Sequence, residues 1–489
     1  MLNVEKTTPW TLDQLLAATG GRLAGGSDGE RSFVAIGTDS RTIGPGELFV
    51  ALAGERYDGR AFIRDAVARG AAGVLVAETA ATAEGLAGLP AGIPVVAVAD
   101  TLTGLGDLAA FRRRLFADLP VLAVTGSSGK TTVKEMVAAI LELRHIVLKT
   151  RGNFNNLVGL PLSLLPLDRH HQVALLEMGM NRPGEIARLA AIAAPDISCI
   201  VNVQAAHLEG LGSIEGVALA KNELFAGTRE NGTLVVNLDD PLVRDLARRH
   251  RHKKITCGLN EEADVRAGDL VGLGRRGTAF TLHIGPESHE IILAAPGRHN
   301  VTNALAAGAM AHALGADPVD IARGLAAFTP CDKRSRLETL ANGLMVINDC
   351  YNANPASMRA ALTMLADLGR TGKKIAVLGD MLELGEGSAA AHRAIGETAA
   401  RLGLDYLAAF GPQGAETVRA AREQGLDPAR ARSFADKEEL TAWLADLIGR
   451  QGLAGEDWLL VKGSRGMRME SVLDTLRTIA FSFSTGNRT

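Results

Sequence analysis

Three observations predict an α/β fold divided into three domains. The chain has 489 residues, which corresponds to about three domains at roughly 150 residues each. Hydrophobic residues make up 47% of the sequence, enough for several buried cores, whereas aromatic residues make up only 4%. Short apolar runs alternate with helical patterns along most of the chain, which is typical of parallel sheets joined by helical crossovers.

The first domain is predicted over residues 1–100 as a small α/β unit that ends near Asp100. Residues 59–70 have a helical pattern. Three apolar runs have the length of short strands: residues 48–52, 74–77 and 93–98.

The second domain is predicted over residues 101–330 as a central parallel sheet like that of phosphate-loop ATPases. Residues 131–143 place apolar side chains at helical spacing, which predicts an amphipathic helix. Two runs, 278–284 and 289–293, lie so close together that we expect an antiparallel hairpin at the sheet edge. Helical stretches separate the other strand-like runs, which are residues 122–125, 173–178, 197–203 and 233–238.

The third domain is predicted over residues 331–489 as a Rossmann-like unit. Strand-like apolar runs again alternate with helical stretches, which predicts a second parallel sheet. The runs are residues 345–349, 374–378, 406–410 and 458–461.

The charge balance and the cysteines exclude several classes of protein. The chain carries 52 Lys and Arg against 55 Asp and Glu, a formal net charge of −3, which argues against a nucleic-acid or membrane-surface binder. The four cysteines form no C-x-x-C pair, so a zinc or redox site has little support. No apolar run approaches the roughly 20 residues that span a bilayer, and residues 1–16 lack the apolar core of a signal peptide. We expect a monomer that is not embedded in a membrane and works in a reducing cytoplasm.

Two local patterns have a purely structural interpretation. The basic run at residues 248–254 follows a helical pattern and has no interleaved aromatic residues, so we interpret it as a solvated helix end. The glycines of residues 272–277 match G-x-G-x-x-G, but no apolar strand precedes them and a strand follows. We therefore expect a hairpin turn there and not a dinucleotide site.

The sharpest motif is Gly-Ser-Ser-Gly-Lys-Thr-Thr at residues 126–132, between a predicted strand and a predicted helix. Glycines let backbone N–H groups turn toward a phosphate, and the helix N-terminus adds partial positive charge. Lys130 can then reach the β- and γ-phosphates of a nucleotide, and the Thr131 hydroxyl can bind Mg²⁺. The alternative is a tight strand-to-helix turn with a threonine N-cap. Val124 stands where the common motif has another glycine, so this shorter loop indicates a particular branch of phosphate-loop enzymes rather than GTPases.

Three further residues are candidates for metal binding or substrate activation. Glu177 ends an apolar strand, and a carboxylate at the carboxyl end of a parallel strand faces the crevice where ligands bind. His207 follows the next strand at the same sheet edge. Lys221 falls on the apolar stripe of a helix around residues 216–226. Either its stem snorkels along the surface, or a partner or a modification accounts for a buried amine.

Polar residues also mark the approach to the third domain and its beginning. Asn300 and Asn303 open a helix and share one face, so Asn300 is either an N-cap or, with Asn303, a contact to adenine. Arg336 and Asp349 begin the third domain, and Asp349 ends an apolar strand. Asn354 and the proline after it have the pattern of an N-cap followed by proline at the first helical position.

These residues together resemble the Mur ligases, the ATP-dependent amide-forming enzymes of peptidoglycan precursor synthesis. The segments at 351–355 and 379–385 favour the member that adds D-alanyl-D-alanine, and the Asp-Asn-Pro-Arg-like segment of the preceding ligase is missing from the sequence. The resemblance covers nearly the whole chain, with motifs in the family's order: Asp39-Ser40-Arg41, 126–132, Asn153-Phe154-Asn155-Asn156, Glu177-Met178-Gly179, His207, 220–225, 297–303, 349–355, Leu378-Gly379-Asp380-Met381 and Lys462-Gly463-Ser464-Arg465.

The resemblance implies a role for each candidate residue. The catalytic residues it implies are Lys130, Lys221 and His207. Those implied to bind ATP are Gly126, Ser127, Ser128, Gly129, Lys130, Thr131, Thr132, Asn300, Asn303, Arg336 and Asp349. Two Mg²⁺ ions are implied, bound by Thr131, Glu177, His207 and a carbamylated Lys221. The UDP-sugar substrate is implied to contact Asp39, Ser40, Arg41, Asn155 and Asn156.

The resemblance also implies the reaction and its small-molecule substrates. The terminal carboxylate of UDP-MurNAc-tripeptide attacks the γ-phosphate of ATP, and the amine of D-alanyl-D-alanine then attacks the acyl phosphate. ATP contacts from two domains imply closure that excludes water. Two alternatives of the same class are another Mur ligase and a folylpolyglutamate synthase, which share the short loop. An alternative of another class is a nucleotide-dependent switch, which needs neither an acyl acceptor nor Lys221.

Overall fold

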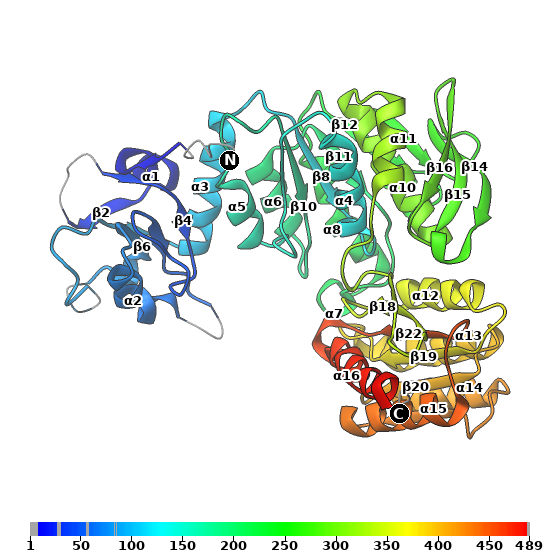
Figure 1. Ribbon diagram of the computed structural model, residues 1–489. Coiled ribbons are helices and arrows are strands. Elements are labelled where there is room, and N and C mark those ends of the chain that lie inside the picture. The colour runs from blue at the N-terminus through cyan, green and yellow to red at the C-terminus, as the bar shows by residue number, and fades with distance from the viewer. Residues whose placement is uncertain (1–7, 27–30, 55–57, 83, 85, 487–489) are drawn as a thin grey trace.

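The computed structural model describes residues 8–26, 31–54, 58–82, 84 and 86–486. These residues form three α/β units in chain order, and the third lies below the second in the view of Figure 1. The predicted fold class is therefore confirmed, whereas the domain boundaries after residues 100 and 330 stay a prediction. In the part of the chain that the structure describes, no helix is both long and apolar enough to cross a membrane.

The N-terminal unit contains a five-stranded sheet. Its elements are β1 (Trp10–Thr11), α1 (Leu12–Thr19), β2 (Arg22–Gly25), β3 (Ser32–Phe33), β4 (Ile36–Gly37), β5 (Leu48–Val50), η1 (Gly59–Phe62), α2 (Ile63–Ala68), β6 (Gly73–Ala77), η2 (Glu78–Ala80) and β7 (Val95–Val98). The strand order is β2-β7-β6-β5-β4, in which β2 is antiparallel to β7 and the other pairs are parallel. The three predicted strands correspond to β5, β6 and β7, and the predicted helix is divided between η1 and α2.

Helix α3 (Thr101–Leu115) joins the first two units. Asp100 caps it, because an Asp100 carboxylate oxygen accepts a hydrogen bond from the Thr103 N–H at 2.6 Å. One buried cluster contains Leu105 and Leu108 of α3 together with apolar residues of both flanking units. Figure 1 shows α3 between the N-terminal sheet and two helices of the central unit, α5 (Gly159–Leu164) and α6 (Glu185–Ala193).

The central unit is built on a nine-stranded sheet in the order β16-β15-β14-β13-β12-β11-β8-β10-β9. Its strands are β8 (Val121–Thr125), β9 (Val147–Lys149), β10 (Val173–Glu177), β11 (Ile197–Ile200), β12 (Thr233–Asn237), β13 (Lys253–Gly258), β14 (Val265–Gly272), β15 (Thr278–Ile284) and β16 (Glu287–Leu293). The other elements are α4 (Lys130–Leu141), α7 (Leu208–Leu211), α8 (Ile214–Ala226), α9 (Pro241–Ala247), η3 (Gly274–Arg276), α10 (Arg298–Leu314) and α11 (Pro318–Ala327).

The central sheet is parallel except at the edge where the antiparallel hairpin was expected, so the predicted architecture is confirmed. Strands β8 to β14 pair in parallel, but β14, β15 and β16 form antiparallel pairs. The turns that join β14 to β15 and β15 to β16 are too short for the crossover connection that a parallel pair needs, so these strands pair in antiparallel fashion. The expected β15–β16 hairpin is confirmed, and the glycines of residues 272–277 form the expected turn between β14 and β15.

Helices cover both faces of the central sheet. The cluster on one face includes residues of α4, α10 and α11, and the cluster on the other includes residues of α3, α5, α6, α8 and α9. The basic run begins directly after α9 and continues into β13, as its interpretation as a helix end requires. This two-sided packing leaves the carboxyl ends of the parallel strands, and the loops that follow them, free to form a site.

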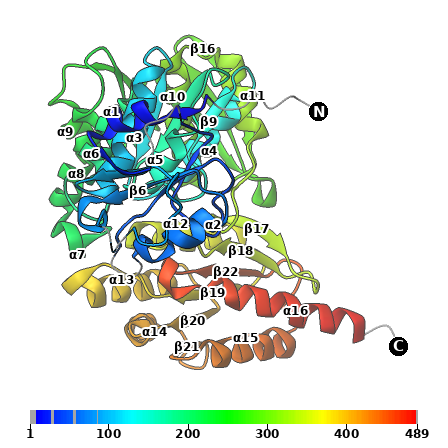
Figure 2. The same ribbon diagram turned by 90° about the vertical axis from the view of Figure 1, so that its left-hand side faces the viewer.

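The C-terminal unit has a six-stranded sheet in the order β17-β18-β22-β19-β20-β21, in which β17 is antiparallel and the other pairs are parallel. The four predicted strands match β18, β19, β20 and β22. Figures 1 and 2 both place α12 on the side nearest the central unit. The elements are β17 (Arg336–Thr339), β18 (Met345–Asp349), α12 (Pro355–Leu368), β19 (Lys374–Gly379), η4 (Gly385–Gly387), α13 (Ser388–Arg401), β20 (Tyr406–Phe410), α14 (Gly414–Glu423), β21 (Ala431–Phe434), α15 (Lys437–Gln451), β22 (Trp458–Lys462), η5 (Arg465–Met467) and α16 (Glu470–Gly486).

Candidate active site

A cavity of about 800 Å³ lies between the central and C-terminal units. Loops that follow β8, β10 and β11 line it from the central unit, and the segments after β18 and β22 line it from the C-terminal unit. Both sets of loops lie at the carboxyl ends of parallel strands, where ligands bind in open α/β sheets. The cavity therefore lies where the sequence predicts the site.

The predicted phosphate loop joins β8 to α4 at one wall of the cavity. Gly129 is the N-cap residue of α4, with φ at +78°, and a Cβ there would lie 2.4 Å from Asn303 Oδ1. Glycine is required at this position, and the alternative of a threonine N-cap is wrong. The first N–H groups of α4 have no acceptors within the helix, so the loop offers donors to an anion.

Lys130 folds back over this loop, and its Nζ donates a hydrogen bond to the Gly126 carbonyl oxygen at 2.7 Å. Burial lowers the pKa of Lys130, while the negative charge of Glu177 opposes that shift and the positive charge of Arg334 adds to it. A cation with little solvent around it attracts an anion more strongly than an exposed one does.

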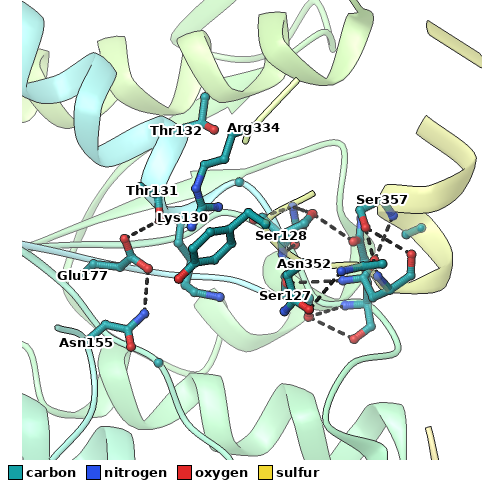
Figure 3. Close-up of a pocket in the computed structure, with 18 of the residues that line it drawn as sticks. Ser127, Ser128, Lys130, Thr131, Thr132, Asn155, Glu177, Arg334, Asn352 and Ser357 are labelled. Carbon is teal, nitrogen blue, oxygen red and sulfur yellow. Dashed lines mark hydrogen bonds between the residues drawn. The ribbon is translucent and has the colours of Figure 1, made fainter. Parts of the chain in front are cut away.

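Glu177, the last residue of β10, lies at the start of α4 with a 1% exposed side chain. One carboxylate oxygen accepts a hydrogen bond from the Thr131 hydroxyl at 2.7 Å, and the other accepts one from Asn155 Nδ2 at 2.7 Å. Figure 3 shows these three side chains converging at the cavity wall. The structure thus brings together a carboxylate, a hydroxyl and an amide, the oxygen-bearing groups that Mg²⁺ prefers.

Lys221 lies within α8 and is 1% exposed, so snorkelling does not explain its place on the apolar stripe. Its Nζ contacts the sulfur of Met180 at 3.6 Å, and Met180 lines the cavity whereas Lys221 does not. Burial, and then the positive charge of Lys130, hold the pKa of Lys221 well below its usual value. The amine is therefore held in a state that favours the neutral form.

His207 is the N-cap residue of α7, with φ at +55°, and lines the cavity. Its Nδ1 lies 2.5 Å from an Oε2 of Glu383, which belongs to the C-terminal unit. The hydrogen bond from His207 is the main cause that lowers the pKa of Glu383. His207 thus contacts the other unit as well as the cavity.

Asn300 and Asn303 lie on the cavity wall formed by α10, and both are buried. Gly297 is the N-cap residue of this helix, so the alternative that Asn300 is the N-cap is wrong. The Asn300 Nδ2 donates to the Pro296 carbonyl oxygen at 2.8 Å, and the Asn303 Nδ2 donates to Asn300 Oδ1 at 3.4 Å. The pair is thus held in a fixed orientation beside the phosphate loop.

Asp349 lines the cavity from the end of β18, but Arg336 lies outside it. Asp349 accepts from the Ser335 N–H at 2.9 Å and pairs with Lys462 Nζ at 2.5 Å. Arg336 is exposed at the start of β17 and pairs with Asp332 at 3.4 Å, so its implied role at the phosphates stays a prediction. Arg334 lines the cavity instead, with its guanidinium 3.8 Å from the centre of the Tyr351 ring.

Comparison with known proteins identifies the family. Models named "Mur ligase family, catalytic domain", "Mur ligase middle domain" and "Mur ligase, glutamate ligase domain" match residues 32–113, 124–311 and 335–465. The UDP-N-acetylmuramoyl-tripeptide--D-alanyl-D-alanine ligase of Escherichia coli K12 is 38% identical over 468 residues, 96% of this chain and 98% of that protein. The chain belongs to the Mur ligase family.

Two solved structures of Mur ligases share the whole fold with this chain. A crystal structure of MurF from Acinetobacter baumannii has 35% sequence identity and a TM-score of 0.87, over 97% of this chain and all of that one. MurF ligase from Thermotoga maritima in complex with ADP has 28% identity and a TM-score of 0.77, over 92% of this chain and 98% of that one. The family resemblance inferred from the motifs is confirmed.

Several cavity residues of this Mur ligase were not singled out as ligands from the sequence. Asn202 holds the phosphate loop, because its Oδ1 accepts from the Ser128 N–H at 3.0 Å. Asn354, expected only as a cap, does cap α12, and its Nδ2 also donates to the Ser127 carbonyl oxygen at 3.3 Å. Asn202 comes just after β11, so the strand-end position that indicated Glu177 could also have indicated it.

The residues expected to hold the UDP-sugar lie at two separate places in the structure. Asn155 and Asn156 line the cavity, and Asn156 Oδ1 accepts a hydrogen bond at 2.8 Å from the N–H of Gly159, the first residue of α5. Asp39, Ser40 and Arg41 lie in the N-terminal unit and are not part of the cavity lining. Hydrogen bonds from Arg41 lower the pKa of Asp39 to about 2.

A second group of possible metal ligands lies before β10, at the edge of the central sheet opposite the cavity. Asp168, His170 and His171 bring their ligand atoms within 4.8 Å of one another. Those atoms already have partners: His170 Nδ1 contacts the Asp168 carboxylate, and His171 Nδ1 accepts from the Asp168 N–H at 3.3 Å. Arg112 also interacts with Asp168, so a metal ion would meet a cation that is already there. This arrangement favours a structural cluster.

Proposed function

We propose that this Mur ligase joins D-alanyl-D-alanine to UDP-N-acetylmuramoyl-tripeptide at the expense of ATP. The observation that carries the proposal is the phosphate loop with the Thr131–Glu177 pair in a cavity between two units. Support comes from relatives named for this reaction in E. coli and, at 36% identity over 442 residues, in Bacillus subtilis. ADP in the T. maritima relative supports a nucleotide at this loop. We place the reaction in the cytoplasm.

Magnesium is the metal that the donor groups fit. The Thr131 hydroxyl and the Glu177 carboxylate are hard oxygen ligands, and Asn155 orients the carboxylate. Mg²⁺ held there would neutralise charge on the phosphates of the nucleotide. His207 lines the same cavity and is proposed for a second ion, in keeping with its implied role.

The chain's own residues position the two reactants. Lys130 and the first N–H groups of α4 face the phosphates and stabilise the charge that spreads over the transferred group. The tripeptide carboxylate forms a bond to the γ-phosphorus as the bond to ADP breaks. The dipeptide amine then forms the amide bond, releases phosphate and gives up a proton. Approach of the two units excludes water from the acyl phosphate.

We propose that Lys221 is carbamylated. A neutral amine adds to carbon dioxide, forming an N–C bond and releasing one proton, and the burial of Lys221 favours that neutral amine. The product bears oxygen atoms like those of a carboxylate, which suits a metal and accounts for a buried amine that contacts a thioether. A labelled bicarbonate experiment should give a carbamate carbon signal that Lys221→Ala removes.

Measurements of activity with and without a small carboxylate distinguish a carbamylated lysine from a merely structural one. We expect Lys221→Ala to lose most activity while staying folded, and added acetate or formate to restore part of it. Lys134 is the matched control, because it is equally buried but paired with Glu135. Lys134→Ala should not respond to acetate. Full activity in Lys221→Ala would remove the carbamate proposal.

A substrate panel tests the proposed reaction. Phosphate release from ATP should require UDP-MurNAc-tripeptide and D-alanyl-D-alanine together, and either one alone should give little. Release that instead requires a folate and glutamate would contradict the proposal and favour a folylpolyglutamate synthase. ATP turnover that needs no acceptor would favour a nucleotide-dependent switch.

A further inference from the structure

The incoming dipeptide has a free carboxylate at the end opposite to its reacting amine, and that charge needs a cation. The described lining of the cavity offers Lys and Arg at four positions: Lys130, Arg334, Lys462 and Arg465. Lys130 lies on the phosphate loop of the central unit, and the other three belong to the C-terminal unit. The proposed reaction places the phosphates at the central unit, so the acceptor's cation is expected among these three.

Two of these three cations, Lys462 and Arg334, already have a partner or a position that suits another role. Lys462 is 3% exposed and donates to Asp349 at 2.5 Å and to the Asn352 carbonyl oxygen at 2.9 Å. Arg334 stacks on Tyr351, and its positive charge contributes to the lowered pKa of Lys130, so it lies beside the phosphate loop. Figure 3 shows Arg334 close to Lys130 and Thr132. Arg334 is therefore suited to the nucleotide.

Arg465 remains, at the start of η5 after β22. Its side chain is 57% exposed, and one guanidinium nitrogen donates to Glu470 at 2.7 Å. The same Glu470 oxygen accepts from Lys333 at 3.1 Å, so Glu470 keeps a partner if Arg465 turns. An arginine has five N–H donors, so the remaining donors can form a two-bond fork with a carboxylate.

A short chain of contacts links Arg465 to the phosphate loop. The Arg465 N–H donates to Asn352 Oδ1 at 3.3 Å, and two residues later Asn354 donates to the Ser127 carbonyl oxygen. A dipeptide spans about 7 Å at most. A carboxylate held on this side of the cavity lets the dipeptide point its amine at the loop where the acyl phosphate forms.

We propose that Arg465 binds the carboxylate of the incoming D-alanyl-D-alanine. This inference rests on the proposed function and names the residue that recognises its second substrate. Arg465 is a substrate-binding residue here, and Glu470 holds its guanidinium at the cavity rim.

The test compares D-alanyl-D-alanine with its C-terminal amide, which lacks the negative charge. In the unchanged protein the amide should raise KM about 10- to 100-fold, as expected for loss of a charge-assisted two-bond contact. Arg465→Ala should raise KM for the dipeptide by a similar factor, with KM for ATP and for the UDP-tripeptide within about twofold. The variant should no longer distinguish the acid from the amide. Arg465→Lys should keep part of that distinction.

Arg477→Ala is the matched control, because Arg477 also pairs with a glutamate of the C-terminal unit and does not line the cavity. It should leave all three KM values unchanged. Arg465→Ala that still prefers the acid by the original ratio, or that raises KM for ATP instead, overturns the inference. If the unchanged protein uses no D-alanyl-D-alanine at all, the proposed function fails instead. A melting temperature near that of the unchanged protein shows that each variant is folded. If Arg465→Ala does not fold, the acid-to-amide ratio of Arg465→Lys tests the inference in its place.

Discussion

The first two units share an apolar core, whereas the second and third meet through polar contacts. Leu108 of α3 belongs to a cluster that extends from Leu48 in the N-terminal sheet to Ile186 in α6. The C-terminal unit has two clusters of its own, one on each face of its sheet. Because they share this core, the first two units form one rigid body. The C-terminal unit has no share in that core and is the part able to move against it.

The contacts at the second junction are few in kind and individually weak. His207 contacts the Glu383 side chain, the Glu209 N–H donates to the Glu383 carbonyl oxygen at 3.2 Å, and Asn354 donates to Ser127. Polar contacts of partly exposed groups contribute about 1 kcal/mol or less each. The junction can therefore open and close, as the proposed exclusion of water requires.

Leu108→Ala is the strongest way to break the first junction. Leu108 is fully buried in the shared cluster, so the cavity left behind should lower the free energy of unfolding by about 2–5 kcal/mol. Trp10 lies in the same cluster, and its fluorescence should follow the loss in a denaturant titration. Leu115→Ala, on the same helix but 49% exposed, should change stability by less than about 0.5 kcal/mol. Equal effects of the two variants would contradict the shared core.

Leu362→Ala should destabilise the C-terminal unit alone. Leu362 is fully buried in a cluster confined to that unit, and its loss should cost about 2–5 kcal/mol there. Trp443 and Trp458 report on this unit, so their transition should move to lower denaturant while that of Trp10 stays in place. A common shift of all three signals would show that the units unfold together.

Glu383→Gln should loosen the second junction with little effect on folding. The charge on Glu383 strengthens its bond to His207, so its removal should change the free energy of unfolding by less than about 1 kcal/mol. Small-angle scattering should nevertheless show a larger average size, because the two bodies separate more often. Glu386→Gln is the control, because Glu386 is exposed in η4, three residues further along the chain, and it should leave the scattering unchanged.

Arg41→Ala should have the smallest effect, because Asp39 and Arg41 take part in neither core. The pKa of Asp39 should rise from about 2 toward 3.8, which NMR titration can measure. Since the folded pKa is depressed, the pair stabilises the fold above pH 3.8 and loses that contribution as the pH falls toward 2. Both side chains are exposed, so the contribution should stay below about 1 kcal/mol.

Buried strands were predictable from the sequence, whereas three edge strands, β9, β17 and β21, were not. Strands β18 and β20 are buried along nearly their whole length, and their apolar runs gave the observed bounds. β17 and β9 have partly exposed residues throughout, and β21 buries only its ends. A strand that buries little of its surface needs no run of apolar residues, so its composition does not distinguish it from a loop.

The same limit applies to the candidate site. Glu177 and Thr131 were predictable because a strand end and a helix start fix where each lies. The place of Arg334 at the cavity was not predictable, because the backbone around it is left-handed at Lys333 and Ser335, with φ at +60° and +52°. Those angles turn the chain just before β17, and non-glycine residues rarely adopt them.

Helix α3 also sets a length. Because its core is continuous with both neighbours, the interval between the Asp39 segment and the phosphate loop cannot stretch without unfolding. If the nucleotide end of the substrate is anchored at the Asp39 segment and its carboxylate must reach the phosphate loop, the distance between the two places fixes the length of substrate that fits. A precursor peptide that is one residue too short or too long would then be rejected by reach alone, before any of its side chains is inspected.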